Sequence, residues 1–205
     1  MRPSASTAPS AAILKLYIRN MVCPSCQRIV RRELEKTGLL IHRVALGKAE
    51  VEQPAGVVLD REQLRADLAQ FGLYLVDDSR EQLVEQIKAV VVQLIHYTPL
   101  EEQPYQNYSN FISEQLDRDY SYLSRQFSMR EGLTLEKYII RQRIERAKEL
   151  LSYQDVRVKE VARQLGYSSA AHLTNQFRQV TGLTPTQFQA LGPGSAGRLS
   201  LDALL

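Results

Sequence analysis

The 205-residue sequence predicts an α+β protein in two parts, a βαββαβ unit followed by an all-α unit. Between residues 13 and 76, short segments that alternate apolar and polar residues bracket segments with helical periodicity. From residue 81 onward, apolar residues recur every three to four positions and strand-like alternation does not return. This change of pattern places the boundary between the two parts near residue 80.

Composition favours a soluble, cytoplasmic protein that does not associate with membranes. The net charge is +3, which permits nucleic-acid binding without arguing for it. Apolar runs stay well short of the roughly 20 residues of a membrane span, and the start lacks the apolar core of a secretory signal. We expect a disordered leader at 1–12, an α+β domain at 13–80, a connecting helix and loop at 81–108, a helical domain at 109–190 and a flexible tail at 191–205.

Each strand and helix expected in the first part is predicted by its own short sequence pattern. Alternating patterns predict four strands, at 13–18, 41–46, 49–53 and 73–78, with the middle two joined as a hairpin across Gly47 and Lys48. The first helix is expected from Cys26 to a stop at Gly38. The second is expected to be capped by Asp60 and to end at Gly72.

The all-α part carries one plan twice: an amphipathic helix, a short turn and a second helix. In the second copy, VKEVARQLGYSSAAHLTNQF, we expect Gly166 in the turn, Ser168 as the N-cap, and Leu173 and Phe177 as buried anchors. This is the pattern of a helix-turn-helix, in which the second helix lies in the major groove of DNA.

The first copy, SNFISEQLDRDYSYLSRQF, repeats this plan with small differences. Asp117 stands in the turn in place of glycine, Asp119 is the expected N-cap, and Leu123 and Phe127 are the expected anchors. Between the copies, LEKYIIRQRIERAKELLSY predicts a long amphipathic helix that holds the two units at a fixed separation. Such an arrangement suits two successive major grooves.

The segments YLSRQF, RIERAKELL, VKEVARQLGYSS and GLTPTQF, in this order and spacing, resemble the DNA-binding domain of AraC/XylS-type transcription regulators over about residues 85–190. The resemblance implies a bacterial, sequence-specific regulator whose partner is double-stranded promoter DNA. In that family, residues on either side of the buried leucine of each recognition helix touch bases. The positions implied here are Tyr120, Ser121, Ser124 and Arg125 in the first helix, and Ser169, Ala170, Ala171, His172, Thr174 and Asn175 in the second.

Chemistry ranks these positions. Arg125 is the strongest candidate because a guanidinium can bond bidentately to guanine. The two alanines of the second helix suit thymine methyl groups or recognition of DNA shape. The alternative for each position is a solvated side chain, since exposed arginines are common on helices.

The first part contains the only two cysteines, Cys23 and Cys26, in the segment MVCPSC. In a reducing compartment, a Cys-x-x-Cys pair is typical of metal or redox sites. Cys26 falls in the first turn of the predicted helix, whose dipole favours thiolate, and Cys23 can turn back so that both sulfurs meet one ion. Two thiolates suit Cu(I), whereas Zn²⁺ needs two further ligands.

With the βαββαβ order, this motif resembles the heavy-metal-associated domain of copper chaperones and metal-transporting ATPases over about residues 13–78. The resemblance implies a ferredoxin-like fold and a site at Cys23 and Cys26 for Cu(I) or another soft metal ion, which DNA binding does not require. This sequence departs from the family in having Asn20 before the loop methionine and Leu73 where a tyrosine is common. Thiol redox sensing and a purely structural domain remain alternatives.

Together these patterns predict a regulator that is not an enzyme, because the sequence lacks a nucleophile–base spacing and a glycine-rich phosphate loop. The first domain is the candidate input and the second the output. One alternative is a metal-trafficking protein whose helical half is a docking module. Another is a DNA-binding regulator whose first domain serves only to form a homodimer.

Overall fold

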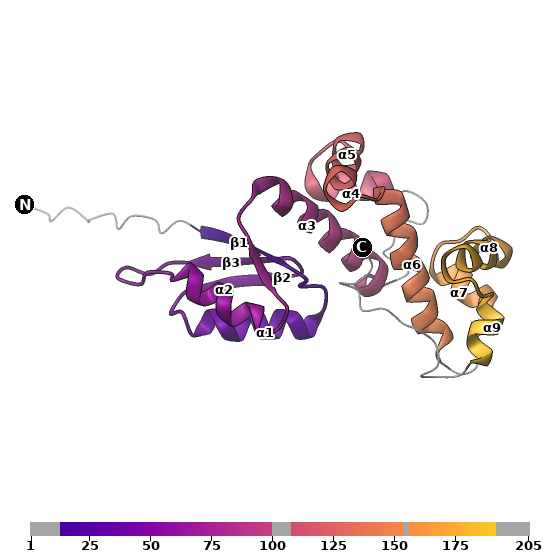
Figure 1. Ribbon diagram of the computed structural model, residues 1–205, viewed down its shortest axis with the longest axis horizontal. Helices are drawn as coiled ribbons and strands as arrows, with labels where there is room; N and C mark the ends of the chain where they lie inside the picture. The colour runs from indigo at the N-terminus through magenta and orange to yellow at the C-terminus, as the bar shows by residue number, and fades with distance from the viewer. Residues whose placement is uncertain (1–12, 100–107, 154–155, 192–205) are drawn as a thin grey trace, which may run out of the picture. The chain divides into compact units, whose positions relative to one another are not determined.

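The computed structural model describes residues 13–99, 108–153 and 156–191, and the chain divides into two compact units, Met1–Asp78 and Ser79–Leu205 (Figure 1). The leader expected at 1–12, most of the loop expected around 98–106 and most of the tail expected at 191–205 lie outside the described residues. No helix in the described ranges is both long enough and apolar enough to span a membrane.

Unit 1 has the element order βαββαβ that the sequence predicts. Its elements are β1 (Ile13–Arg19), α1 (Pro24–Glu35), β2 (Leu40–Ala45), β3 (Lys48–Glu52), α2 (Arg61–Ala69) and β4 (Tyr74–Val76). The first helix begins two residues earlier than expected, because Cys23 is its N-cap and Pro24 fits the first helical turn. Asp60 caps α2, as predicted, by accepting a hydrogen bond from the Gln63 amide.

The four strands form one sheet in the order β2-β3-β1-β4, in which every neighbouring pair is antiparallel. Both helices lie on one face of the sheet (Figure 1). Alternate residues of β1 and β3 point into the core against α1 and α2, and include Leu16, Ile18, Ala49 and Val51. The loop methionine, Met21, is 2% exposed and packs in this core. The loop that carries the cysteines is therefore anchored beside them.

The described residues of unit 2 form helices joined by short turns, and no strand occurs among them. It consists of α3 (Ser79–Val92), a π-helical turn η1 (Gln93–Tyr97), α4 (Tyr108–Leu116), α5 (Tyr120–Glu131), α6 (Leu135–Leu151), α7 (Val158–Gln164), α8 (Ala170–Thr181) and α9 (Pro185–Ala190). The helix that the sequence suggests as a connector packs within this unit, since Val84, Ile87 and Val91 share a core with Leu123 and Phe127.

The long helix α6 divides unit 2 into two halves (Figure 1). Its N-terminal residues Leu135, Tyr138 and Ile139 pack with α3, α4 and α5 in one apolar cluster. Its C-terminal residues pack with α7, α8 and α9 in a second cluster: Ile144, Ala147 and Leu151. Each predicted helix pair thus has its own core, and α6 links the two.

Candidate nucleic-acid interface

The second helices of the two pairs, α5 and α8, are built alike. Each has twelve residues, follows an N-cap whose side chain accepts backbone hydrogen bonds, and ends at a glycine in the left-handed conformation. The caps are Asp119 and Ser169, and the closing glycines are Gly132 and Gly182. Equivalent positions of the two helices therefore differ by a constant offset of fifty residues.

The predicted anchors are buried at equivalent positions. Leu123 and Phe127 of α5, and Leu173 and Phe177 of α8, are all 0% exposed. Each phenylalanine contacts an aromatic ring of the supporting helices: Tyr138 lies 5.1 Å from Phe127 between centroids, and Phe188 lies 5.5 Å from Phe177. Because the anchors bury one face of each helix, the opposite face points away from the core and toward solvent.

The turns before α5 and α8 differ by one residue. Asp117 adopts a positive φ of 49°, two residues before the cap Asp119. Gly166 adopts a φ of 67°, three residues before the cap Ser169. Asp is one of the few residues besides glycine that tolerate this conformation, which explains how the first turn dispenses with glycine.

The prediction that Ser168 caps the second helix is wrong by one position. Ser169 has extended backbone angles, with φ −161° and ψ 161°, and its hydroxyl accepts a hydrogen bond from the His172 amide. Ser168 Oγ instead lies 3.1 Å from Nδ1 of His172. The longer turn places the extended residue one step later along the chain, so that the second of two suitable serines becomes the cap.

In the first helix, the predicted base contacts separate into two groups. Ser121 and Arg125 are exposed. Tyr120 is half-buried against the core around Phe127, and burial raises its pKa. Ser124 is also half-buried, and its carbonyl accepts the Ser128 hydroxyl in an intrahelical bond.

In the second helix, Ala171, His172 and Asn175 are exposed, together with the cap Ser169. Ala170 packs against the core, and the Thr174 hydroxyl donates to the Ala170 carbonyl at 2.8 Å. The structure brings Arg125 and Asn175 to equivalent positions of the two helices, given the offset of fifty residues. These two side chains are the best placed for hydrogen bonds with base edges.

Two outward residues of α5 were not predicted from the sequence. Tyr122 occupies the position equivalent to His172 and is 37% exposed, and Met129, two turns later, is 74% exposed. With Arg125 between them, the three lie at helical spacing on one face. The offset between the copies was visible in the sequence and would have identified Tyr122 from His172.

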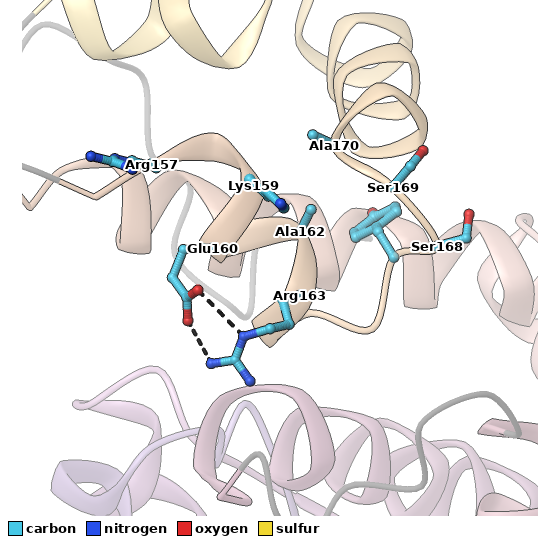
Figure 2. Close-up of a pocket in the computed structure, with 9 residues that line it drawn as sticks. Arg157, Lys159, Glu160, Ala162, Arg163, Ser168, Ser169 and Ala170 are labelled. Atoms are coloured by element: carbon cyan, nitrogen blue, oxygen red, sulfur yellow. Dashed lines mark hydrogen bonds and ion pairs between the residues drawn. The ribbon is translucent and has the colours of Figure 1, made fainter.

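A basic hollow lies between α7 and the start of α8 (Figure 2). It has a volume of about 640 Å³ and is lined by Arg157, Lys159 and Arg163, with Ser168 and Ser169 on the other side. Glu160 pairs with Arg163 at 2.6 Å, and this hydrogen bond lowers the Glu160 pKa. The hollow thus joins cationic side chains to a helix N-terminus, a combination that suits phosphate groups. These α7 residues were not predicted from the sequence.

In unit 1, Cys23 and Cys26 come together as predicted. Their sulfurs are 2.8 Å apart, both residues are half-buried free thiols, and the Cys26 amide donates to Cys23 Sγ at 3.3 Å. Nowhere in the described ranges do three or more His, Cys, Asp or Glu residues gather as a metal site. His42, on β2, pairs with Glu52. Two sulfurs alone fit a soft ion of low coordination number and do not fit tetrahedral Zn²⁺.

The expectation that the helix dipole favours a Cys26 thiolate is wrong in direction. The pKa of Cys26 is raised to about 11, chiefly by burial and also by the hydrogen bond with Cys23 and by electrostatic repulsion from the Cys23 sulfur. Backbone amide contacts lower the pKa but do not reverse the shift. Desolvation of the charged form outweighs the partial charge of the helix terminus at this site.

The comparison with known families bears on unit 2. The helix-turn-helix domain family matches residues 112–190. The matched region includes α5, α6, α7, α8 and α9 and most of α4, and therefore contains both outward helix faces and the basic hollow.

Curated relatives are similar to part of this chain. An uncharacterized HTH-type transcriptional regulator of Staphylococcus aureus is 34% identical over 82 residues, covering 40% of this chain and 11% of that protein. The probable transcriptional regulator LumQ of Photobacterium leiognathi is 32% identical over 63 residues, covering 31% of this chain and 25% of that protein. The chain therefore spans between about a tenth and a quarter of the length of these relatives.

A solved structure is also similar to part of this chain. It is the C-terminal domain of the two-component response regulator yesN from Fusobacterium nucleatum, at a TM-score of 0.43 and 26% identity. The similarity covers 50% of this chain and 96% of that one.

Proposed function

We propose that this protein is a DNA-binding transcription regulator of the AraC type, whose helix-turn-helix domain recognises a promoter sequence. The observation that carries the proposal is the duplicated helix pair, in which α5 and α8 have equal lengths, equivalent caps and equivalent buried anchors. Two recognition helices on one rigid support suit a DNA site with two contact regions. The printed names of the relatives, both transcriptional regulators, agree with this proposal.

The proposed contacts divide by chemistry. Arg125, Asn175 and His172 offer hydrogen bonds to base edges, and an asparagine can bond bidentately to adenine. Tyr122 and Met129 offer apolar surface to thymine methyl groups. The basic hollow of α7 offers phosphate contacts, which position the protein on the duplex without reading sequence.

Arg125→Ala is expected to weaken binding to a guanine-containing site by about 1–3 kcal/mol, a loss of roughly 5- to 150-fold. The reason is the loss of a bidentate bond from an exposed guanidinium on the outward face of α5. Fluorescence anisotropy with a duplex enriched from a random-sequence pool on the wild-type protein measures the loss. Selection on the variant should also relax the preference at one base pair.

Arg31→Ala is the matched control, since Arg31 is an exposed arginine of α1 in unit 1. It should leave the affinity unchanged. An equal loss by Arg125→Ala on every duplex, with no change in base preference, would assign Arg125 to phosphate and not to base recognition. Failure of the wild-type protein to enrich any duplex at low salt would contradict the proposed function itself.

For unit 1 we propose a ferredoxin-like domain that senses a soft metal ion or the redox state through Cys23 and Cys26. The βαββαβ order, the antiparallel sheet and the 2.8 Å approach of the two sulfurs support this proposal. A bound ion would supply charge that fixes both thiolates in one position. The chain's own part is to hold the loop rigid through Met21 and through Asn20, whose Nδ2 donates to the Gly72 carbonyl.

The sensing proposal has a direct test in anaerobic titration of the full-length protein with Cu(I), following metal stoichiometry and duplex affinity together. Sensing requires that the ion bind two states of the protein with different affinity, so duplex affinity must change on loading. A Cys23→Ser, Cys26→Ser double variant should lose both responses. Binding of one Cu(I) without any change in duplex affinity would support a metal site in unit 1 but would contradict a regulatory role for it.

The raised Cys26 pKa gives a prediction for thiol reactivity. Because the pKa moves from 9.0 to about 11, the thiolate fraction near pH 8 falls by about 100-fold, and only the thiolate is a nucleophile. Iodoacetamide should therefore modify Cys26 slowly at pH 8 and steadily faster up to pH 11, as peptide mass spectrometry at each pH would show. Unfolding in urea should remove the difference, which serves as the control. Fast modification of Cys26 in the folded protein at pH 8 would contradict a raised Cys26 pKa.

A further inference from the structure

Arg143, in the middle of α6, is held between two aromatic rings. Its Cζ lies 3.8 Å from the ring centroid of Tyr167 and 5.3 Å from that of Tyr108. Both distances fall within the range of cation–π contact, and in each case the guanidinium carbon lies over the ring. Arginine suits such a site because its guanidinium is flat and weakly hydrated.

Two nitrogens of the Arg143 guanidinium, Nη2 and Nε, also lie inside this site. Nη2 donates to the Leu165 carbonyl at 2.7 Å, in the turn between α7 and α8. Nε is buried and has no hydrogen-bond partner among the described residues. A buried donor without a partner opposes folding, so the stacking and the single hydrogen bond must offset it. The contacts with the two rings and with the turn carbonyl therefore fix the position of the Arg143 side chain.

The two rings belong to different halves of the domain. Tyr108 is the first residue of α4, in the first helix pair, and Tyr167 lies in the turn of the second pair. Burial raises the pKa of Tyr167 to about 12, so its phenol stays neutral at physiological pH. Arg143 thus bridges the first pair and the second from the helix that separates them.

Tyr167 in turn contacts the second recognition helix, α8. Its hydroxyl donates to Gln176 Oε1 at 2.6 Å, and its ring meets the His172 ring edge-on, with centroids 5.2 Å apart. Both partners lie on α8, and His172 is one of the proposed base contacts. A contiguous series of contacts therefore runs from Tyr108 through Arg143 and Tyr167 to the outward face of α8.

Among the described residues, the first helix pair shows no equivalent arrangement. Its turn residue with positive φ, Asp117, corresponds to Gly166 and is followed by Arg118, whereas Gly166 is followed by the aromatic Tyr167. The bridge is thus a specific feature of the second turn and not a repeated part of the helix-turn-helix plan.

We propose that Arg143 is a positioning residue that fixes α8 relative to the first helix pair, and so sets the spacing between the two DNA segments that α5 and α8 read. The proposal rests on the proposed DNA-binding function. Arg143 itself need not touch DNA, because it acts through Tyr167.

The test compares Arg143→Met with the wild-type full-length protein on duplexes enriched from a random pool by the wild type. Methionine keeps an unbranched apolar stem but removes the planar cation. The variant should bind the enriched duplex about tenfold more weakly, and should lose little or nothing on duplexes in which the two contact segments are moved apart or together by one base pair. Repeated selection on the variant should yield a broader range of spacings.

Three further variants separate positioning from simple destabilisation. Tyr167→Leu should reproduce the broadened spacing, whereas Tyr167→Phe should retain the wild-type spacing because the ring remains. Arg143→Lys should restore the spacing only partly, because a lysine is a point charge without the planar stack. It also serves as the reporter should the methionine variant fail to fold.

The outcomes are distinguishable. Enrichment by the wild type, with spacing preference lost in Arg143→Met and Tyr167→Leu, supports the proposal. Equal weakening on every spacing means that Arg143 only stabilises the fold, and overturns the proposal while leaving the proposed function intact. Failure of the wild type to enrich any duplex overturns both.

Discussion

Lys88→Met is expected to lower the free energy of unfolding of unit 2 by about 3–5 kcal/mol, because it removes the cation from between two buried carboxylates. Lys88 Nζ lies 2.9 Å from Glu85 on its own helix and 2.9 Å from Glu131 at the end of α5. The three side chains are only 9%, 6% and 13% exposed. Urea unfolding followed by circular dichroism measures the loss.

The loss should depend on pH. Without Lys88, the Glu85 and Glu131 carboxylates repel each other in a poorly solvated site, so at least one acquires a pKa raised above its unfolded value. Such a group favours the folded state only while protonated, and that contribution disappears as the pH rises through the raised pKa. The gap between variant and wild type should therefore be smaller at pH 5 than at pH 8.

Two controls isolate the buried charge. Arg130→Met breaks the more exposed Arg130–Glu81 pair, 3.2 Å long, between the same two helices, and should cost less than about 1 kcal/mol. Adding Glu85→Gln and Glu131→Gln to Lys88→Met should recover most of the stability. A Lys88→Met protein as stable as the wild type at pH 8 would show that the carboxylates remain well solvated.

This cluster also bears on how, under the proposed function, a signal from unit 1 would reach the DNA-binding helices. Chain continuity makes α3 the first element of unit 2, and its Lys88 and Glu81 both pair with the last turn of α5. The π-helical turn η1 follows, and His96 within it bonds to Gln142 of α6 at 3.0 Å. Short π-helical segments often mark functional sites. Movement of α3 would therefore disturb its ion pairs with α5.

Periodicity predicted the parts of the fold that local pattern decides. The buried anchors Leu173 and Phe177, the cap Asp119 and the turn at Gly166 each follow from spacing within one short segment. The position of the second cap did not follow from local spacing. Ser168 and Ser169 are equally suitable caps, and the length of the turn decides between them.

Features that depend on tertiary packing were out of reach of the sequence. The helix dipole and burial act on Cys26 in opposite directions, and only the folded loop shows that burial prevails. Arg143 appeared as one of several helical arginines, since its partners Tyr108 and Tyr167 lie far away along the chain on opposite sides of it. The basic hollow likewise requires α7 to meet the start of α8.

Phe127→Ala and Phe177→Ala are each expected to destabilise the helix-turn-helix domain by about 3–5 kcal/mol, since both rings are fully buried. The two rings belong to separate apolar clusters on either side of α6. Each substitution should therefore loosen its own recognition helix more than the other. Amide hydrogen exchange, resolved by residue, should show faster opening of α5 in the first variant and of α8 in the second.

Phe→Leu at each position is the matched control, because it keeps most of the apolar volume and removes only the ring contact with Tyr138 or Phe188. These variants should lose less than about 1.5 kcal/mol. On an enriched duplex, Phe177→Ala should lose discrimination in the segment read by α8 and retain it where Arg125 of α5 binds, while Phe127→Ala should do the reverse. Loss of discrimination in both segments by either variant would mean that α6 transmits disorder between the halves, and the two helices would then act as one reading unit.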